Sequence, residues 1–288
     1  MNDIFTQVKE YRESFIDVLK QTGHHYDSNL VEYRTPSGKH NIKYFKWKHP
    51  YQNSWEYDEI FTDGILNYLK ETLSKPDSVA IDIGAQVGLI TVGFAQFAKK
   101  VIAFEPNPAA FEVLEKNSEI YKNIIPYNLA CSNKEDILEF HYSDEGFCNG
   151  GFAVGCNKGI GVTGHNIPMD VYAINLLDFL NTYHTNDIKN IKLIKIDTEG
   201  RDKEIIKTIY PILKDIKPIL ITEMYAGLIE SEIVDLIDTI KNAAYRIYDI
   251  GDKNSGLEAL RLCKQINSIA DIQVGSHRNF LCIIDKNL

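Results

Sequence analysis

The sequence predicts an α/β fold in which a mostly parallel, seven-stranded sheet carries helices on both faces. Two observations predict it: short apolar segments of strand length recur from residue 79 onward, and segments with helical periodicity separate them. Such alternation is typical of parallel sheets, in which right-handed crossovers place helices over both faces. The expected strands are 79–83, 101–105, 124–129, 192–197, 218–223, 245–249 and 280–284.

The first two strands and the turn between them are the most informative part of the chain. The apolar run 79–83 is typical of a fully buried parallel strand, and Gly84 and Gly88 bracket a turn whose backbone amides a ligand can approach. A helix over about 89–98 points its partly positive N-terminus at the same place. Glu105 ends the next strand about twenty residues on, where an acidic side chain accepts hydrogen bonds from ribose hydroxyls. This combination predicts a nucleoside-cofactor site.

The details of the turn favour S-adenosylmethionine over NAD. A dinucleotide site prefers G-x-G-x-x-G, in which the second glycine lets backbone approach the pyrophosphate. This chain has Gln86 at that place and reads D-x-G-x-x-x-G, with Asp82 just before the turn. A carboxylate there suits the cationic end of S-adenosylmethionine, which is therefore the expected cofactor. NAD is the alternative cofactor.

Composition limits the class of protein. The 288 residues are 44% hydrophobic, which is enough for one domain of about 200 residues plus an extension. The formal net charge of -9 argues against nucleic acid as a substrate. The five cysteines form no C-x-x-C pair, which is typical of reduced cytosolic thiols. Because no apolar stretch reaches the roughly eighteen residues of a membrane span, we expect a soluble cytoplasmic protein.

The chain divides into a predicted extension over 1–75 and a main domain over 76–288. The extension contains an amphipathic helix over about 3–20, a β-hairpin of 30–34 and 42–47 around the turn-forming residues 35–38, and a helix over 57–73. Within the main domain, 137–142 indicates an extra strand. The glycine-rich segment 143–168 that follows is either a substrate-side lid or disordered.

Several motifs together resemble the FkbM-type family of S-adenosylmethionine-dependent methyltransferases, from about residue 55 to the C-terminus. They are Trp55-Glu56, the turn Asp82-Ile-Gly-Ala-Gln-Val-Gly88, Glu105-Pro106, Lys195-Ile-Asp-Thr-Glu-Gly200, Glu223 after the next strand and His277-Arg-Asn279 before the last one. Two positions depart from the family pattern: Gln86 stands where asparagine is common, and Asp202 where a second glutamate is common. The resemblance implies a class I methyltransferase (Rossmann-like) fold and O-methylation, with sugars and natural products as typical acceptors.

The expected catalytic groups are carboxylates at strand ends. Asp197 ends the fourth core strand, Glu199 follows two residues later, and Glu223 ends the next strand. They are suited to accept the acceptor's proton, to hold its hydroxyl or to ligate a divalent metal. Metal dependence is not favoured, because the adjacent acidic pair that often completes such sites is missing. Capping of the following helix is the structural alternative for Asp197 and Glu199. Histidine bases at His165 or His277 stay open.

The predicted contacts form three sets. For the cofactor they are Glu56, Asp82, Gly84, Gln86, Gly88, Glu105, Pro106, Asn107, Asn128, Ala130 and Asp197; for the substrate, His165, His277 and Asn279; for a metal, none. The function we expect is O-methylation of a sugar hydroxyl on a surface polysaccharide or glycolipid. The alternatives are O-methylation of a small natural product, an NAD-dependent oxidoreductase on a Rossmann sheet, and a binding module without activity.

Overall fold

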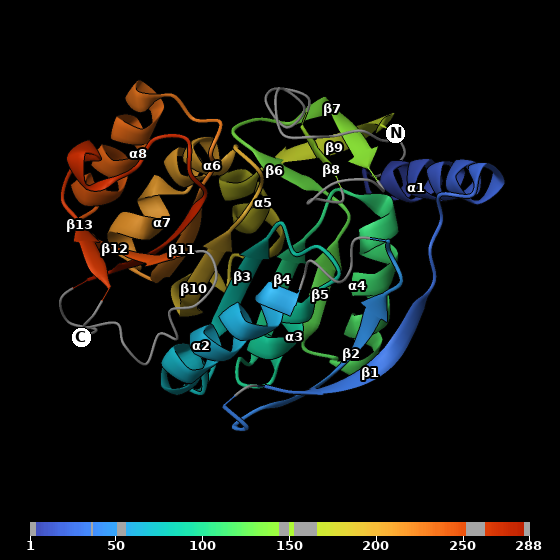
Figure 1. Cartoon of the computed structure of the whole chain (residues 1–288), viewed down its shortest axis with the longest axis horizontal. Coiled ribbons are helices and arrows are strands. Elements are labelled where there is room, and N and C mark those ends of the chain that lie inside the picture. Colours follow the sequence, from blue (N-terminus) through green and yellow to red (C-terminus); the bar gives the residue numbers. More distant parts are fainter. Residues whose placement is uncertain are drawn as a thin grey trace.

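An eight-stranded sheet forms the centre of the computed structural model, which describes residues 4–35, 37–50, 56–143, 150–152, 166–251 and 263–284 (Figure 1). The strand order is β13-β12-β14-β11-β10-β3-β4-β5. The strands are β3 (Val79–Ile83), β4 (Lys100–Phe104), β5 (Ile124–Tyr127), β10 (Ile191–Ile196), β11 (Ile219–Met224), β12 (Arg246–Gly251), β13 (Lys264–Ile266) and β14 (Arg278–Ile283). Neighbours from β11 to β5 pair in parallel, whereas β14 pairs antiparallel with β11 and with β12, and β12 pairs antiparallel with β13.

The seven predicted strands are present, and the predicted strand count needs one correction. Strand β13 pairs with β12 at the sheet edge, so the sheet has eight strands rather than seven. With three residues, Lys-Gln-Ile, this strand is too short and too polar to show strand periodicity in the sequence. The predicted strand 124–129 ends early, at Tyr127, because the chain leaves the main sheet there and Ala130 begins another strand.

Helices cover both faces of the sheet, because alternate residues of each buried strand point to opposite sides. On one face, Ile81 and Ile83 join a core with α5 (Leu176–Tyr183), α6 (Asp202–Thr208), α7 (Tyr210–Asp215) and α8 (Glu230–Asn242). On the other, Ala80 and Ala103 join a core with α2 (Glu56–Leu73), α3 (Leu89–Ala95) and α4 (Pro108–Ile120). The apolar strands are therefore enclosed, as the sequence predicts.

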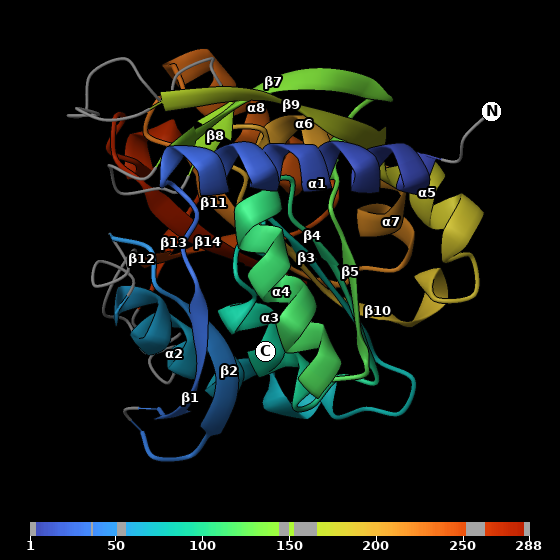
Figure 2. The same ribbon diagram turned by 90° about the vertical axis from the view of Figure 1, so that its right-hand side faces the viewer.

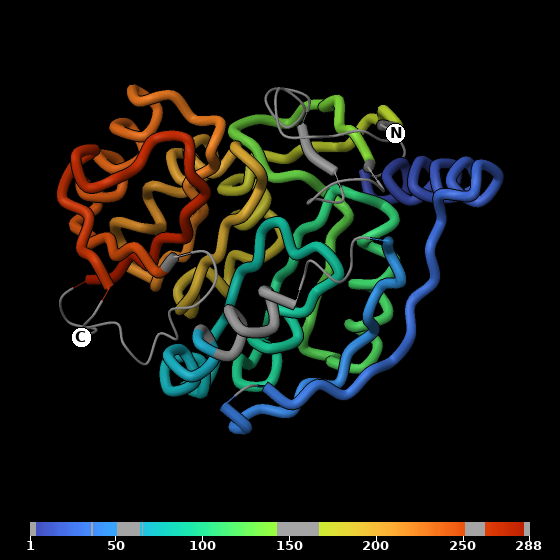
Figure 3. Tube along the Cα trace, viewed as in Figure 1, coloured from blue at the N-terminus to red at the C-terminus, as the bar shows by residue number. Residues whose placement is uncertain are grey.

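The N-terminal part of the chain follows the outside of this core. Helix α1 (Ile4–Thr22) lies across the molecule, against α4 and strand β9 (Asn166–Asn175), as Figure 2 shows. Strands β1 (Ser28–Arg34) and β2 (Asn41–Trp47) then form an antiparallel hairpin that packs on α4 and α3. The blue part of the trace in Figure 3 shows this path along the flank of the sheet. The helix and hairpin lie where the sequence places them, and the division at residue 75 stays a prediction.

A second sheet lies beyond the main one, with the order β6-β9-β7-β8. It is built from β6 (Ala130–Ser132), β7 (Asp136–Ser143), β8 (Gly150–Phe152) and β9 (Asn166–Asn175). Only β7 is predicted from the sequence, and β9 is missed because Pro168 and two polar ends interrupt its apolar pattern. Residues 144–149 and 153–165 of the glycine-rich segment, with His165, lie outside the described residues.

No helix in the described parts of the chain is both long enough and apolar enough to cross a membrane.

Candidate cofactor and catalytic site

The predicted site residues that the structure describes gather at the carboxyl ends of the parallel strands. Parallel strands end at one edge of their sheet, so the segments after β3, β4, β10 and β11 become neighbours. This edge carries Gly84, Glu105, Asp197 and Glu223 from four separate parts of the chain. The side chain of Glu56, at the start of α2, is not among those described.

The glycines of the first turn are required by the protein's own packing. Gly84 has a φ of +77°, and a Cβ there would lie 1.7 Å from the carbonyl oxygen of Asp197. Gly88 has a φ of +89°, and its Cβ would lie 2.6 Å from Cδ1 of Leu114. The backbone of Gly84 also donates to the carbonyl of Phe104. Glycine therefore lets the ends of β3, β4 and β10 meet closely, in addition to the cofactor role that the sequence predicts.

The side chain of Glu105 links the turn after β3 to the turn after β4. Its Oε2 accepts from the backbone N–H of Gln86 at 2.7 Å, and its Oε1 accepts from that of Asn107 at 2.8 Å. The residue is 6% exposed. Burial raises the pKa of Glu105 to about 7, although both backbone hydrogen bonds oppose the rise. The carboxylate is thus held in place from two sides at the edge of the sheet, with its remaining lone pairs available to hydroxyl donors.

The other residues predicted around the adenosine shape the turn after β4. Asn107 caps helix α4, since its Oδ1 accepts from the backbone N–H groups of Ala109 and Ala110 at the start of that helix. Asn128 donates through Nδ2 to the carbonyls of Glu105 and Pro106. Ala130 is buried in β6. These are internal contacts, so contact of the four residues Pro106, Asn107, Asn128 and Ala130 with the cofactor stays a prediction.

Asp82 lies beneath the turn in a buried ionic network. It is 0% exposed; its Oδ2 accepts from the hydroxyl of Thr91 at 2.6 Å, and its Oδ1 lies 3.5 Å from Nζ of Lys195. The same ammonium lies 3.3 Å from Oδ2 of Asp197. Burial lowers the pKa of Lys195, but the carboxylates of Asp197 and Asp82 outweigh it, so that pKa is raised and the lysine is charged. In the structure, Asp82 thus anchors Lys195, and its contact with the cofactor stays a prediction.

Asp202, which stands out in the sequence only as a departure from the family pattern, is a positioning residue in the structure. Its Oδ2 accepts from the backbone N–H and hydroxyl of Thr198, and its Oδ1 accepts from the Thr222 hydroxyl and the backbone N–H of Glu223. Burial raises the pKa of Asp202 to about 6. In the sequence, its acidic place in the family pattern and its place at the start of α6 are the two signals, and neither indicates a tie between two strand ends.

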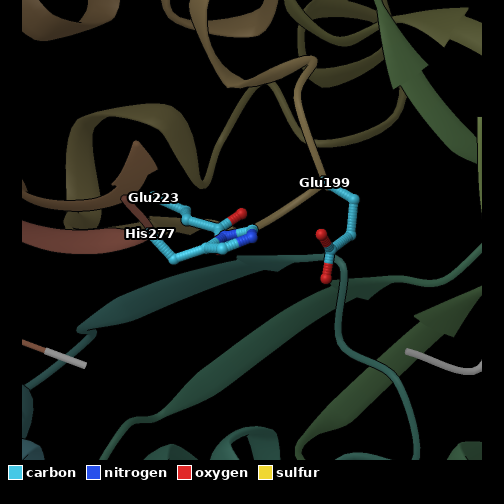
Figure 4. A group of neighbouring side chains, drawn as sticks. All are labelled: Glu199, Glu223 and His277. Carbon is cyan, nitrogen blue, oxygen red and sulfur yellow. The ribbon is translucent and has the colours of Figure 1, made fainter. Parts of the chain in front are cut away.

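Glu199, Glu223 and His277 form the other group at this edge (Figure 4). One possible ligand atom from each side chain lies within 4.8 Å of the other two. Nδ1 of His277 is 2.9 Å from Oε1 of Glu223, because antiparallel pairing of β11 with β14 sets Glu223 opposite Asn279. Figure 4 shows the imidazole and the Glu223 carboxylate side by side, facing the carboxylate of Glu199.

The three carboxylates predicted to be catalytic, those of Asp197, Glu199 and Glu223, therefore do not form one group. Asp197 lies with Lys195 and keeps its side chain 37% exposed, while His277 joins the two glutamates. Burial raises the pKa of Glu199 well above its usual range, and the carboxylates of Glu223 and Asp197 add to the effect. Burial likewise raises the pKa of Glu223, with further contributions from the carboxylates of Asp197 and Asp202. Asn279, of the predicted substrate residues, is half-buried beside this group.

The sequence of the chain matches the model of a known protein family. The model of the Methyltransferase FkbM domain matches residues 82–247, which is more than half of the chain and includes the first turn, Asp197, Glu199 and Glu223. A protein of Dictyostelium discoideum named as a candidate methyltransferase is 32% identical over 77 residues. That match spans 27% of this chain and 27% of the relative's length.

The solved structures that are similar to the chain include two methyltransferases. The FkbM methyltransferase of Methylobacillus flagellatus KT is 13% identical, with a TM-score of 0.45 over 80% of this chain and 57% of its own. A candidate methyltransferase of Streptococcus mutans, solved with SAH, is 16% identical, with a TM-score of 0.42 over 76% of this chain and 94% of its own. Both TM-scores are below 0.5, so neither likeness contributes to the assignment. The domain match over residues 82–247 confirms the predicted resemblance, and the chain belongs to the FkbM methyltransferase family.

Proposed function

We propose that the protein is an S-adenosylmethionine-dependent O-methyltransferase that acts on a sugar hydroxyl of a surface polysaccharide or glycolipid. The observation that carries the proposal is the Glu105 carboxylate, held by two backbone N–H groups at the edge of the sheet in an FkbM-family domain. The sugar acceptor is supported by the acceptors typical of the family. The acidic site and the net charge of -9 suit a neutral, hydroxyl-rich acceptor better than a polyanion.

The residues at this edge fit the cofactor's chemistry. Glu105 is placed to accept from a ribose diol, since both of its oxygens are oriented by backbone N–H groups. Asp197 gives the edge a partly exposed carboxylate, which suits the cationic amino-acid end and sulfonium. Gln86 has a φ of +51° and carries a side chain where a dinucleotide site needs glycine, which argues against a pyrophosphate at this turn.

When bound, the cofactor would supply an activated methyl group on a sulfonium. The chain's own residues then have two tasks: to align the acceptor hydroxyl for in-line attack and to take its proton. Asp197 is our proton acceptor, because its side chain is accessible and Lys195 holds its orientation at 3.3 Å. Glu199, Glu223 and His277 line the same edge and would hold the hydroxyl. The cofactor would supply the methyl group to the acceptor oxygen and leave as a neutral thioether, while Asp197 would take the hydroxyl proton.

Calorimetric titration with S-adenosylmethionine and, separately, with NAD tests the cofactor. We expect micromolar binding of S-adenosylmethionine alone, weakened about 10- to 100-fold by Glu105→Ala, because a charge-assisted hydrogen bond contributes about 1.5 to 3 kcal/mol. The exposed Glu139→Ala, in the second sheet, is the matched control and should leave the affinity unchanged. Binding of NAD instead, or unchanged affinity in Glu105→Ala, would contradict the assignment. Transfer of a labelled methyl group to a panel of glycans then tests the acceptor.

A further inference from the structure

We propose that Glu199, Glu223 and His277 form a binding site for a divalent cation of the Mn²⁺ or Zn²⁺ type. A role for this cation in orienting and acidifying the acceptor hydroxyl rests on the proposed function, whereas cation binding itself does not. The sequence does not favour a metal, because an adjacent acidic pair is missing. In the structure, His277, 54 residues beyond Glu223, stands beside that glutamate instead.

The geometry of the three side chains suits one shared ion. Their ligand atoms lie within 4.8 Å of one another. An ion held at about 2.1 Å separates any two of its ligand atoms by no more than about 4.2 Å, so a small side-chain rotation closes the site. The side chains converge from the loop after β10, the end of β11 and the residue before β14, as Figure 4 shows.

A buried oxygen without a partner points to a ligand at this place. Glu223 is 9% exposed, and its Oε1 is engaged by His277. Its Oε2 is buried and has no hydrogen-bond partner among the described residues. A buried carboxylate oxygen in this position needs a donor or a cation. The histidine pairing accounts for one oxygen of Glu223, and an ion shared with Glu199 accounts for the other.

The excess of negative charge at this edge of the sheet also favours a bound cation. Carboxylates of Asp197, Glu199, Asp202 and Glu223 converge here, and the neighbouring ammonium of Lys195 is already shared between Asp82 and Asp197. A divalent cation between Glu199 and Glu223 would offset this excess of negative charge.

Contacts with surrounding residues also fix the segments that carry Glu199, Glu223 and His277. Asp202 ties the loop that carries Glu199 to the strand end that carries Glu223, through four hydrogen bonds. Tyr225 packs edge-on against His277, with ring centroids 5.1 Å apart, and Gly200 and Gly227 leave room for the tyrosine ring. Such outer contacts orient ligands in metal sites.

The donor set selects the kind of ion. Two carboxylate oxygens and one imidazole nitrogen suit Mn²⁺ or Zn²⁺, whereas Ca²⁺ and Mg²⁺ prefer oxygen ligands alone. Three protein ligands leave a coordination position for a hydroxyl, whose pKa the ion would lower. This matters because a carboxylate is a weak base for an alcohol. By lowering the pKa of the hydroxyl, the ion would ease the transfer of its proton to Asp197.

Direct titration of the full chain with Mn²⁺ tests the proposal without any turnover. Chelator-treated protein is titrated with MnCl₂, and free Mn²⁺ is followed by electron paramagnetic resonance; ZnCl₂ is titrated by calorimetry. We expect one tight equivalent in the wild type, weakened about 10-fold or more by Glu223→Gln and by His277→Ala. The control is Glu139→Gln, which alters the surface pair of Glu139 and His141 (3.0 Å) and should bind Mn²⁺ like the wild type.

Each outcome decides the proposal. No binding of either ion by the wild type, or equal binding by the wild type and both variants, overturns it. If a melting curve shows that Glu223→Gln does not fold, Glu199→Gln takes its place with the same expected loss. Binding of S-adenosylmethionine is measured on the same samples: cofactor binding without ion binding refutes the metal site alone, and ion binding without cofactor binding refutes the proposed function alone.

Discussion

The buried carboxyl group of Glu105 makes the stability of the fold depend on pH, and Glu105→Gln isolates that dependence. The ordinary pKa of 4.5 applies to the unfolded chain, and burial raises the folded-state pKa to about 7. Between these values the folded protein binds the proton more tightly than the unfolded chain. Its stability therefore falls as pH rises from about 4.5 to about 7, and this contribution is then constant.

The magnitude follows from the difference between the two pKa values. A difference of about 2.5 at 1.36 kcal/mol each corresponds to about 3 kcal/mol of lost stability across this range. Full burial of the group makes solvent screening negligible. The neutral amide introduced by Glu105→Gln cannot titrate, so the variant should lose less stability than the wild type over the same range, by about 3 kcal/mol.

Urea unfolding at pH 5, 6, 7 and 8 measures both slopes. Other carboxyls with raised pKa values, such as Asp202, tilt both curves equally and cancel in the comparison. The control Glu139→Gln, whose side chain is 65% exposed, should keep the wild-type slope. Parallel curves for wild type and Glu105→Gln, within about 1 kcal/mol, would refute the assignment of a raised pKa to Glu105.

Three further predictions concern the same edge of the sheet. Gly84→Ala should destabilise the fold by more than about 3 kcal/mol in urea unfolding, since its Cβ would lie 1.7 Å from the Asp197 carbonyl oxygen; a loss below about 1 kcal/mol would show that the strand ends shift freely. Lys195→Met should cost about 3 to 5 kcal/mol, because it leaves Asp82 buried without its cation, and Asp82→Asn in the same chain should restore part of the loss; purely additive losses would contradict the ion pair. Asp197→Asn should reduce turnover about 100-fold or more in a labelled-methyl assay and should weaken cofactor binding far less, by at most about 10-fold; equal losses would make it a cofactor ligand alone.

The order of the elements could be predicted from the sequence because burial on both faces gives each central strand a local signal. Strand β3 is apolar except for Asp82, β10 is apolar except for Lys192 and Lys195, and the glycines at 84 and 88 mark the turn after β3. The strands that were missed lack this signal: β6, β8 and β13 have only three residues each, and β9 contains a proline. Such strands exist because a neighbouring strand offers backbone partners, which local sequence does not record.

The sequence by itself determined the family and the residue types at the strand ends, since the turn after β3 and the Lys195–Gly200 segment are local patterns. Only the tertiary structure decided how those residues group. It separates Asp197, which pairs with Lys195, from Glu199 and Glu223, and it brings His277 to the two glutamates. It also assigns Asp202 to the tie between two strand ends. The physical reason is that hydrogen bonds and ion pairs depend on distances of a few ångströms between segments far apart in the chain. Strand pairing and the side-chain hydrogen bonds between loops and strand ends set those distances.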